Sequence, residues 1–240
     1  MDRAAARFLE LAVAMLVLAL ALPLLLGAML AIWIADGRTP IYRAPRVGQG
    51  GRDFTMFKLR TMVPGADRLG RFAPEADPRI TRVGAWLRRT KLDELPQFWN
   101  VLRGEMAIVG PRPDVRSGVE LYSPEEMRLL AVRPGLTGLA SLVFFDEGQL
   151  LARVADPTTY YMTAIRPLKS RLCQLQFEGR PTADLRIALL TVLRFVSRDA
   201  ALAGVARILE AFGAEDDLLA LCGQRPQTAI LSGATEALRG

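Results

Sequence analysis

Residues 11–34 read LAVAMLVLALALPLLLGAMLAIWI and contain no charged side chain. Because an α-helix rises about 1.5 Å per residue, a segment of this length can cross a hydrocarbon core of roughly 30 Å. Pro23 lies at the midpoint, where it removes a backbone hydrogen bond and bends the helix. The segment therefore predicts a kinked membrane helix, and this helix indicates that the fold is that of a membrane protein.

Positive charge flanks the apolar segment on both sides, so the positive-inside rule gives no orientation. Arginines stand at positions 3 and 7 before it and at 38, 43, 46 and 52 after it. A helix that enters and leaves the bilayer by the same face accounts for the charges and for the proline. A cleaved signal peptide is the alternative, but the apolar run is too long and Pro40-Ile41-Tyr42 offers no small-residue cleavage site. We expect a retained, re-entrant anchor.

The overall composition limits which side chains can serve in catalysis or bind a metal. The 240 residues carry a net charge of +6 and contain no histidine, and the two cysteines, Cys173 and Cys222, lie far apart. This pattern argues against a zinc site and against a secreted fold built on disulfides. Without histidine, catalysis must use carboxylates, lysine, arginine or a metal. The positive charge, concentrated between Asp36 and Lys91, indicates an anionic partner such as phosphate or lipid headgroups.

Turn residues and apolar spacing predict the remaining elements. The glycine-rich residues 48–51 form a turn signal between short strands at 41–42 and 54–57, which together predict a β-hairpin. Apolar residues at spacings of three and four predict helices over residues 80–89, 95–102, 124–130, 158–176, 184–195 and 200–212. The fold class is therefore α+β and mainly helical.

The most informative stretch is RRTKLDELPQFWNVLRGEMAIVGPRPD, residues 88–114. Asp93 and Glu94 are adjacent carboxylates just before a helical stretch, and Thr90 stands where a helix cap could lie. Because neighbouring residues on a helix diverge by about 100°, the two acids are expected to have different roles. Taken alone, the pair would be interpreted as complementing a helix dipole.

Basic residues around the two acids change that interpretation. Arg88 lies upstream, Arg112 stands between two prolines, and Lys58 and Arg60 follow the predicted hairpin strand. Arginine forks match phosphate oxygens bidentately, and flanking prolines stiffen the backbone that presents Arg112. The stretch therefore predicts a phosphate cradle around a carboxylate.

Five motifs in order resemble the signature of the bacterial sugar transferases, the monotopic phosphoglycosyl transferases: KLRTM at 58–62, DPRIT at 77–81, LDELPQ at 92–97, VGPRP at 109–113 and RPGLTG at 133–138. The resemblance covers residues from about 8 to 195. Lys91 stands where the family customarily has serine. The resemblance implies a monotopic membrane protein with a kinked re-entrant helix at residues 1–38 and a catalytic domain at 39–196 that faces the cytoplasm. It also implies interfacial amphipathic helices, and we expect residues 197–240 to form a C-terminal helical appendage.

What the resemblance implies chemically is a two-step transfer at the bacterial inner membrane. Asp93 attacks the β-phosphate of a UDP-sugar, releases UMP and holds the sugar phosphate until polyprenyl (undecaprenyl) phosphate takes it. Asp93 and Glu94 would bind Mg²⁺, and the substrate phosphates would meet four cations: Lys58, Arg60, Arg88 and Arg112. An ionised carboxylate needs no base to act as a nucleophile, which suits a chain without histidine. The product would begin glycoconjugate or exopolysaccharide synthesis, and the sequence leaves a homodimer open.

A membrane-anchored basic protein that binds anionic lipid without catalysis is the main alternative. It leaves the Asp93 region unexplained. A nucleic-acid partner is not expected, because the basic residues are not interleaved with aromatic residues and no known nucleic-acid module is present. The sequence leaves open which sugar is transferred and in which glycan pathway.

Overall fold

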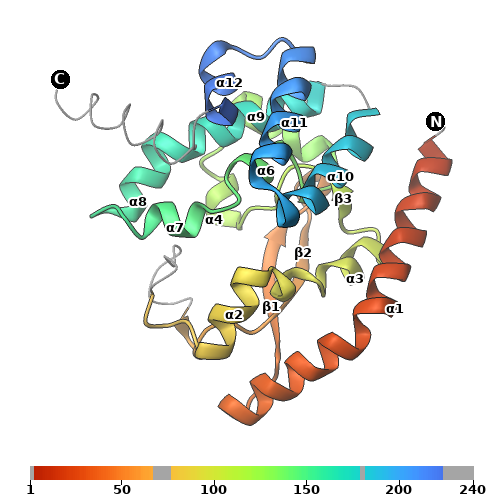
Figure 1. The fold of residues 1–240 in the computed structure, drawn as a ribbon, viewed down its shortest axis with the longest axis vertical. Helices are drawn as coiled ribbons and strands as arrows, with labels where there is room; N and C mark the ends of the chain where they lie inside the picture. Colours follow the sequence, from red (N-terminus) through yellow and green to blue (C-terminus); the bar gives the residue numbers. More distant parts are fainter. Residues whose placement is uncertain (1–2, 67–76, 179–181, 224–240) are drawn as a thin grey trace. The chain divides into compact units, whose positions relative to one another are not determined.

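The computed structural model describes residues 3–66, 77–178 and 182–223 (Figure 1). The chain divides into two compact units. The first comprises Met1–Ile108, Pro113–Tyr122 and Leu130–Leu136, and the second comprises Val109–Arg112, Ser123–Leu129 and Thr137–Gly240. Residues 224–240 of the expected C-terminal appendage lie outside the described residues.

Helix α1 (Arg3–Asp36) carries the apolar segment of the first unit. By length and composition it could cross a membrane, and only 17% of its most apolar stretch is buried. Pro23 lies inside the helix, which bends along its course in Figure 1. A long, exposed apolar helix fits membrane association, while re-entry into the bilayer stays a prediction.

The predicted hairpin is confirmed and is longer than the sequence indicated. Strands β1 (Ile41–Val47) and β2 (Asp53–Leu59) pair antiparallel from Ile41↔Leu59 to Val47↔Asp53. The turn between them is a 3₁₀ segment, Gln49–Gly51, in which Gly50 and Gly51 have φ of 68° and 72°. Glycine suits these positions because a side chain is strained at positive φ.

Short helices follow the hairpin in the first unit: α2 (Arg82–Thr90), the 3₁₀ turn η3 (Leu92–Glu94), α3 (Gln97–Leu102) and α4 (Arg116–Val119). Strands β3 (Ala107–Val109) and β4 (Gly135–Thr137) form a second two-stranded sheet. Two apolar clusters fix α1 to these elements. One joins Ala14 to the hairpin and α3, and the other joins Leu25, Ala28 and Ile32 to β2 and α2.

Polar contacts also fix the start of α1 within the first unit. Arg7 donates to the carbonyl oxygen of Val101 at 2.7 Å, and the Glu10 carboxylate accepts from the backbone N–H of Ile108 at 2.7 Å. Together with the apolar clusters, these bonds mean that both halves of α1 lie against the same unit.

The described part of the second unit is mainly helical. In chain order its elements are α5 (Pro124–Met127), the 3₁₀ turn η4 (Arg128–Ala131), which straddles the two units, α6 (Leu139–Val143), α7 (Glu147–Leu151), α8 (Pro157–Tyr160), the π-helical turn η5 (Tyr161–Ile165), α9 (Arg166–Glu178), α10 (Thr182–Val196), α11 (Arg198–Ala211) and α12 (Asp216–Gly223). Helix α11 packs against α6, α10 and α12. The predicted helices at 184–195 and 200–212 are confirmed as α10 and α11. The single helix predicted over 158–176 is instead α8, η5 and α9.

The prediction made for Thr90 is wrong. Thr90 does not cap the following helix, because it is the last residue of α2 and its hydroxyl donates back to the carbonyl oxygens of Trp86 and Leu87. The chain turns instead at Lys91, which has φ of 56° and is the one described non-glycine residue with positive φ. Lys91 thus ends α2 and begins η3, the turn that carries the two adjacent acids.

Candidate functional site

Helix α2 is docked tightly on the backbone of Thr61. Thr81 caps the helix by accepting from the Gly84 N–H, and its own N–H donates to the Thr61 carbonyl oxygen at 3.0 Å. A Cβ at Gly84 would lie 2.6 Å from the carbonyl carbon of Thr61, far inside van der Waals contact. Glycine is therefore required here for the close approach of helix and backbone.

This docking places Arg88, one of the predicted phosphate ligands. The Nε–H of Arg88 donates to the Thr61 hydroxyl oxygen at 2.9 Å, and Thr61 is itself buried. Burial lowers the pKa of Arg88, whereas the charges of Asp93 and Asp77 raise it. Arg88 is thus a partly desolvated cation within electrostatic reach of Asp93.

Asp93 is the buried acid of the pair. The residue is 7% exposed, and its Oδ1 atom is buried without a hydrogen-bond partner. Burial raises the pKa of Asp93, Glu94 raises it further, and the charges of Lys58, Lys91 and Arg88 lower it. A carboxylate removed from water and surrounded by three cations has the electrostatic environment that favours a nucleophile or a phosphate-site acid.

Glu94 points into a different environment, as its helical offset from Asp93 predicted. Its Oε1 atom accepts from Lys58 Nζ at 3.1 Å, and both side chains are about a fifth to a quarter exposed. Lys58 lies within β2 and not after it, so the strand itself presents the cation. The two acids therefore have separate roles in the structure: one is buried with an unpartnered oxygen, and the other is paired at the edge of the site.

Two further residues, Arg60 and Arg112, are predicted to bind phosphate. Arg60 donates from Nε to the Thr39 carbonyl oxygen at 2.9 Å and from a terminal nitrogen to the Thr39 hydroxyl at 3.2 Å. Arg112 lies in the second unit, in a stretch without regular secondary structure. The first unit thus brings together Asp93, Glu94, Lys58 and Arg88, and the phosphate roles of Arg60 and Arg112 stay predictions.

Asp93 and Glu94 are also the predicted metal ligands. In the described part of the chain there is no group of three or more His, Cys, Asp or Glu side chains that could hold a metal. Mg²⁺, however, is commonly held by one or two carboxylates together with substrate phosphates and water. Two adjacent acids, one of them with an unpartnered oxygen, fit that mode of binding.

Sequence reasoning missed two residues of this region. Thr61, inside the KLRTM motif, links α2 and Arg88, and its buried hydroxyl could not be foreseen from the sequence. Gln97, inside LDELPQ, is fully buried, yet neither of its side-chain polar atoms has a partner. The only sequence signal for either residue is its place in a motif.

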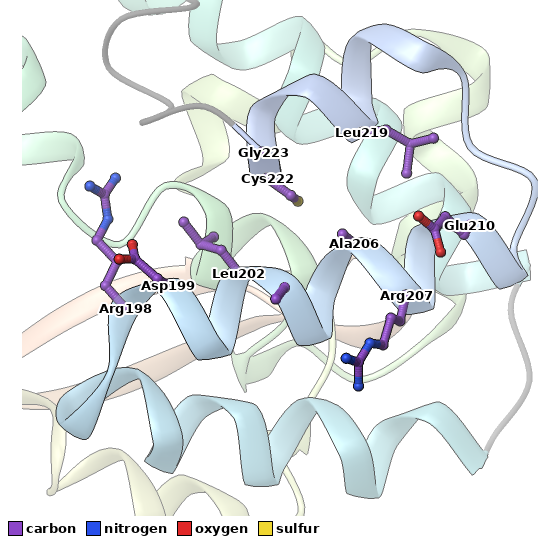
Figure 2. A pocket seen from close by; sticks show the side chains of 10 residues that line it. Arg198, Asp199, Leu202, Ala206, Arg207, Glu210, Leu219, Cys222 and Gly223 are labelled. Carbon is purple, nitrogen blue, oxygen red and sulfur yellow. The ribbon is translucent and has the colours of Figure 1, made fainter.

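A hollow of about 760 Å³ lies between α11 and α12 (Figure 2). Leu202, Ala206 and Leu219 line it beside Arg207 and Glu210, and none of the predicted site residues takes part. Burial raises the pKa of Cys222 in its wall to about 11, so this thiol stays protonated at neutral pH. The Cys222 thiol is therefore not a nucleophile at neutral pH, and the lining of the hollow includes neither Asp93 nor Glu94.

Comparisons with known proteins agree with the motifs. The model of a family described as bacterial sugar transferase matches residues 1–169. The chain is 40% identical over 154 residues to the exopolysaccharide production protein ExoY of Rhizobium meliloti, which covers 58% of this chain and 68% of that protein. It is 45% identical over 142 residues to the UDP-glucose:undecaprenyl-phosphate glucose-1-phosphate transferase of Caulobacter vibrioides, covering 57% of this chain and 52% of that one.

A third relative is the UDP-N-acetylgalactosamine-undecaprenyl-phosphate N-acetylgalactosaminephosphotransferase of Aeromonas hydrophila. It is 38% identical over 141 residues, which cover 57% of this chain and 33% of the relative. The chain thus spans between a third and about two thirds of the length of these three proteins.

Proposed function

This chain belongs to the bacterial sugar transferase family, and on that premise we propose that it transfers a sugar 1-phosphate from a UDP-sugar to polyprenyl phosphate at a membrane. UMP is the leaving group, and the lipid-linked sugar begins glycoconjugate or exopolysaccharide synthesis. Two relatives are named as transferases of sugar phosphates to undecaprenyl phosphate, and the name of a third places it in exopolysaccharide production.

One observation carries the proposal: Asp93 is a buried carboxylate with an unpartnered oxygen, flanked by the cations Lys58 and Arg88. Burial removes the water shell that would shield an attacking carboxylate. The charges of these cations lower the pKa of Asp93, against the effect of burial, and so favour its ionised form. A structural acid of this burial would be expected to have its oxygens hydrogen-bonded, which Oδ1 is not.

The chemistry then balances in two displacements. An oxygen of ionised Asp93 bonds to the β-phosphorus of the UDP-sugar, and the bond to the bridging oxygen breaks, with its electron pair leaving on UMP. An oxygen of the polyprenyl phosphate next bonds to the same phosphorus, and Asp93 departs as a carboxylate. Arg88 and Lys58 stabilise phosphate charge in both steps, and Glu94 keeps Lys58 in place.

Asp93 and Glu94 would hold Mg²⁺, which when bound would neutralise diphosphate charge. Arg60 and Arg112 are proposed as further phosphate contacts.

The proposal places the enzyme on one face of the bacterial inner membrane, with the acid pair on the cytoplasmic side. Both halves of α1 lie against the first unit, while its outer side chains are exposed, with Leu20 at 72% and Ile34 at 70%. A helix held along both halves by the same unit favours entry and exit through one membrane face over a simple crossing.

The test is a transfer assay with the full chain in detergent or bilayer discs. Undecaprenyl phosphate, Mg²⁺ and a panel of UDP-sugars are supplied, and UMP release and lipid-linked product are measured. We expect turnover with at least one UDP-sugar and none with Asp93→Asn. The noncatalytic alternative predicts vesicle binding that depends on anionic lipid, with no UMP from any donor.

A covalent phosphosugar on Asp93, trapped with the UDP-sugar before lipid is added and located by mass spectrometry, is the expected sign of the two-step route. Full turnover by Asp93→Asn would overturn it.

A further inference from the structure

The helical segment that follows Asp93 has a buried polar face. Buried positions recur at 93, 96, 97, 100 and 101, the spacing of three and four that marks one side of a helix. The backbone stays right-handed helical between η3 and α3, because both Leu95 and Pro96 have αR angles. Asp93, Gln97 and Asn100 therefore lie on successive turns of one face.

That face contacts β2, and Asn100 shows what a structural amide does there. Its Nδ2 donates to the Thr55 carbonyl oxygen at 2.7 Å and to Glu105 at 2.7 Å, while its Oδ1 accepts from the Phe57 N–H at 3.0 Å. Asn100 thus satisfies the backbone groups of β2 and is itself satisfied. Its hydrogen bonds within the fold are sufficient to account for a structural role.

Gln97 lies one turn earlier and is equally buried, but its side chain makes no hydrogen bond within the fold. Its side chain is 0% exposed, and neither Nε2 nor Oε1 has a hydrogen-bond partner. In the described part of the first unit, the other buried side-chain atom without a partner is Oδ1 of Asp93. An unpaired amide donor and an unpaired carboxylate acceptor thus lie one helical turn apart on the same face.

A buried amide without partners destabilises a fold, since its desolvation is not compensated. Such a group is explained when its partner is made during function, and hydrogen bonds in active sites often tighten only when substrate binds. We propose that Gln97 is a positioning residue of the transfer reaction, whose Nε2–H donates to Asp93 Oδ1 in the substrate-loaded enzyme and holds the carboxylate in its attacking orientation. This inference rests on the proposed function, because it gives Asp93 the role of nucleophile.

The decisive variant is Gln97→Met, which keeps the volume and removes both polar atoms. A structural glutamine would lose stability on this change, whereas a glutamine without partners in the fold does not. We expect the thermal midpoint of Gln97→Met to equal or exceed that of the wild type. We expect its kcat for UMP release to fall about tenfold to a hundredfold, with KM for the UDP-sugar changed less than threefold, since a hydrogen bond to a charged group orients the nucleophile and does not bind substrate.

Asn100→Leu is the matched control on the same face. It should lower the thermal midpoint markedly, because Thr55 and Phe57 lose their partners. Gln97→Glu supplies a second test. It keeps the shape and the Oε1 acceptor but replaces the donor NH2 by a second oxygen, and we expect a loss of kcat at least as large as in Gln97→Met.

Two results would overturn the inference while leaving the proposed function intact. One is full kcat in both Gln97 variants while Asp93→Asn is inactive. The other is a fall in the thermal midpoint of Gln97→Met as large as that of Asn100→Leu, which would make Gln97 structural. Absence of UMP release from the wild type would instead refute the proposed function itself.

Discussion

Lys58 Nζ lies 3.1 Å from Glu94 Oε1, so the acid next to the buried Asp93 is neutralised by a cation from β2. The same lysine lowers the pKa of Asp93, against the larger effect of burial. One side chain thus serves both acids, and it links the hairpin to the turn that carries them.

Replacing Lys58 by methionine should therefore weaken both functions of this cation. We expect the rate of UMP release at neutral pH to fall about tenfold to a hundredfold, roughly 1.4 to 2.8 kcal/mol in the barrier. The pKa of Asp93 should rise without Lys58, and the ionised acid is the proposed nucleophile, so the acid side of the pH–rate profile should move to higher pH. Lys58→Arg keeps the charge and should lose less. An unshifted profile in Lys58→Met would contradict this account.

Asp93→Asn should stabilise the protein while it abolishes transfer. Burial raises the pKa of Asp93, so the folded chain holds this proton more tightly than the unfolded chain. The stability that this proton gives is present at low pH and is lost as pH rises through the folded pKa. The asparagine side chain does not titrate, so the stability of the variant does not fall as pH rises through the folded pKa of Asp93. Above that pH, in the absence of Mg²⁺ and substrate, the thermal midpoint of the variant should exceed that of the wild type. The exposed Asp216→Asn is the control and should change the midpoint little. A lower midpoint for Asp93→Asn would show that the buried acid is structural.

Gly84→Ala tests the docking of α2 on Thr61. A Cβ at this position would collide with the Thr61 backbone, and overpacking of this kind costs about 1–3 kcal/mol. The displaced helix carries Arg88, so activity should fall together with stability. Gly27→Ala in α1 is the matched control, because a Cβ there meets nothing within 4 Å. Equal thermal midpoints for the two variants would refute the close approach.

Asp77 and Arg79 form a pair whose contribution should depend on pH. Arg79 donates from Nε to Asp77 Oδ1 at 2.9 Å and from a terminal nitrogen to Oδ2 at 2.7 Å, and these bonds lower the pKa of Asp77 from 3.8. The stability from this pair is present above the unfolded pKa and is lost as pH falls through the folded pKa. Asp77→Asn should therefore lower stability at pH 7 by about 1–3 kcal/mol, with a difference that shrinks towards pH 3. A difference that is constant with pH in denaturant titrations would argue against the ion pair.

The sequence by itself determined the local elements and the chemistry-bearing motif. The apolar run around Pro23 gave a single long helix, and the glycine turn gave the hairpin, because both signals act between residues close in the chain. The offset between Asp93 and Glu94 also followed from helical geometry alone. Short elements such as α4, α6, β3 and β4 were not predicted, because three to five residues are too few to show the spacing of apolar side chains that marks a helix or a strand.

Only the tertiary structure decided what each site residue meets. The bond between Lys58 and Glu94 spans 36 positions in the chain, and that between Thr61 and Arg88 spans 27, so neither could be read from local spacing. The Thr90 hydroxyl donates to a carbonyl oxygen of its own helix and does not cap the next one, and Lys91, with its positive φ, forms the turn between them. Burial is a property of all the packed elements together, which is why the desolvated Asp93 and the unpartnered Gln97 appear only when β2, η3 and α3 are packed in one unit.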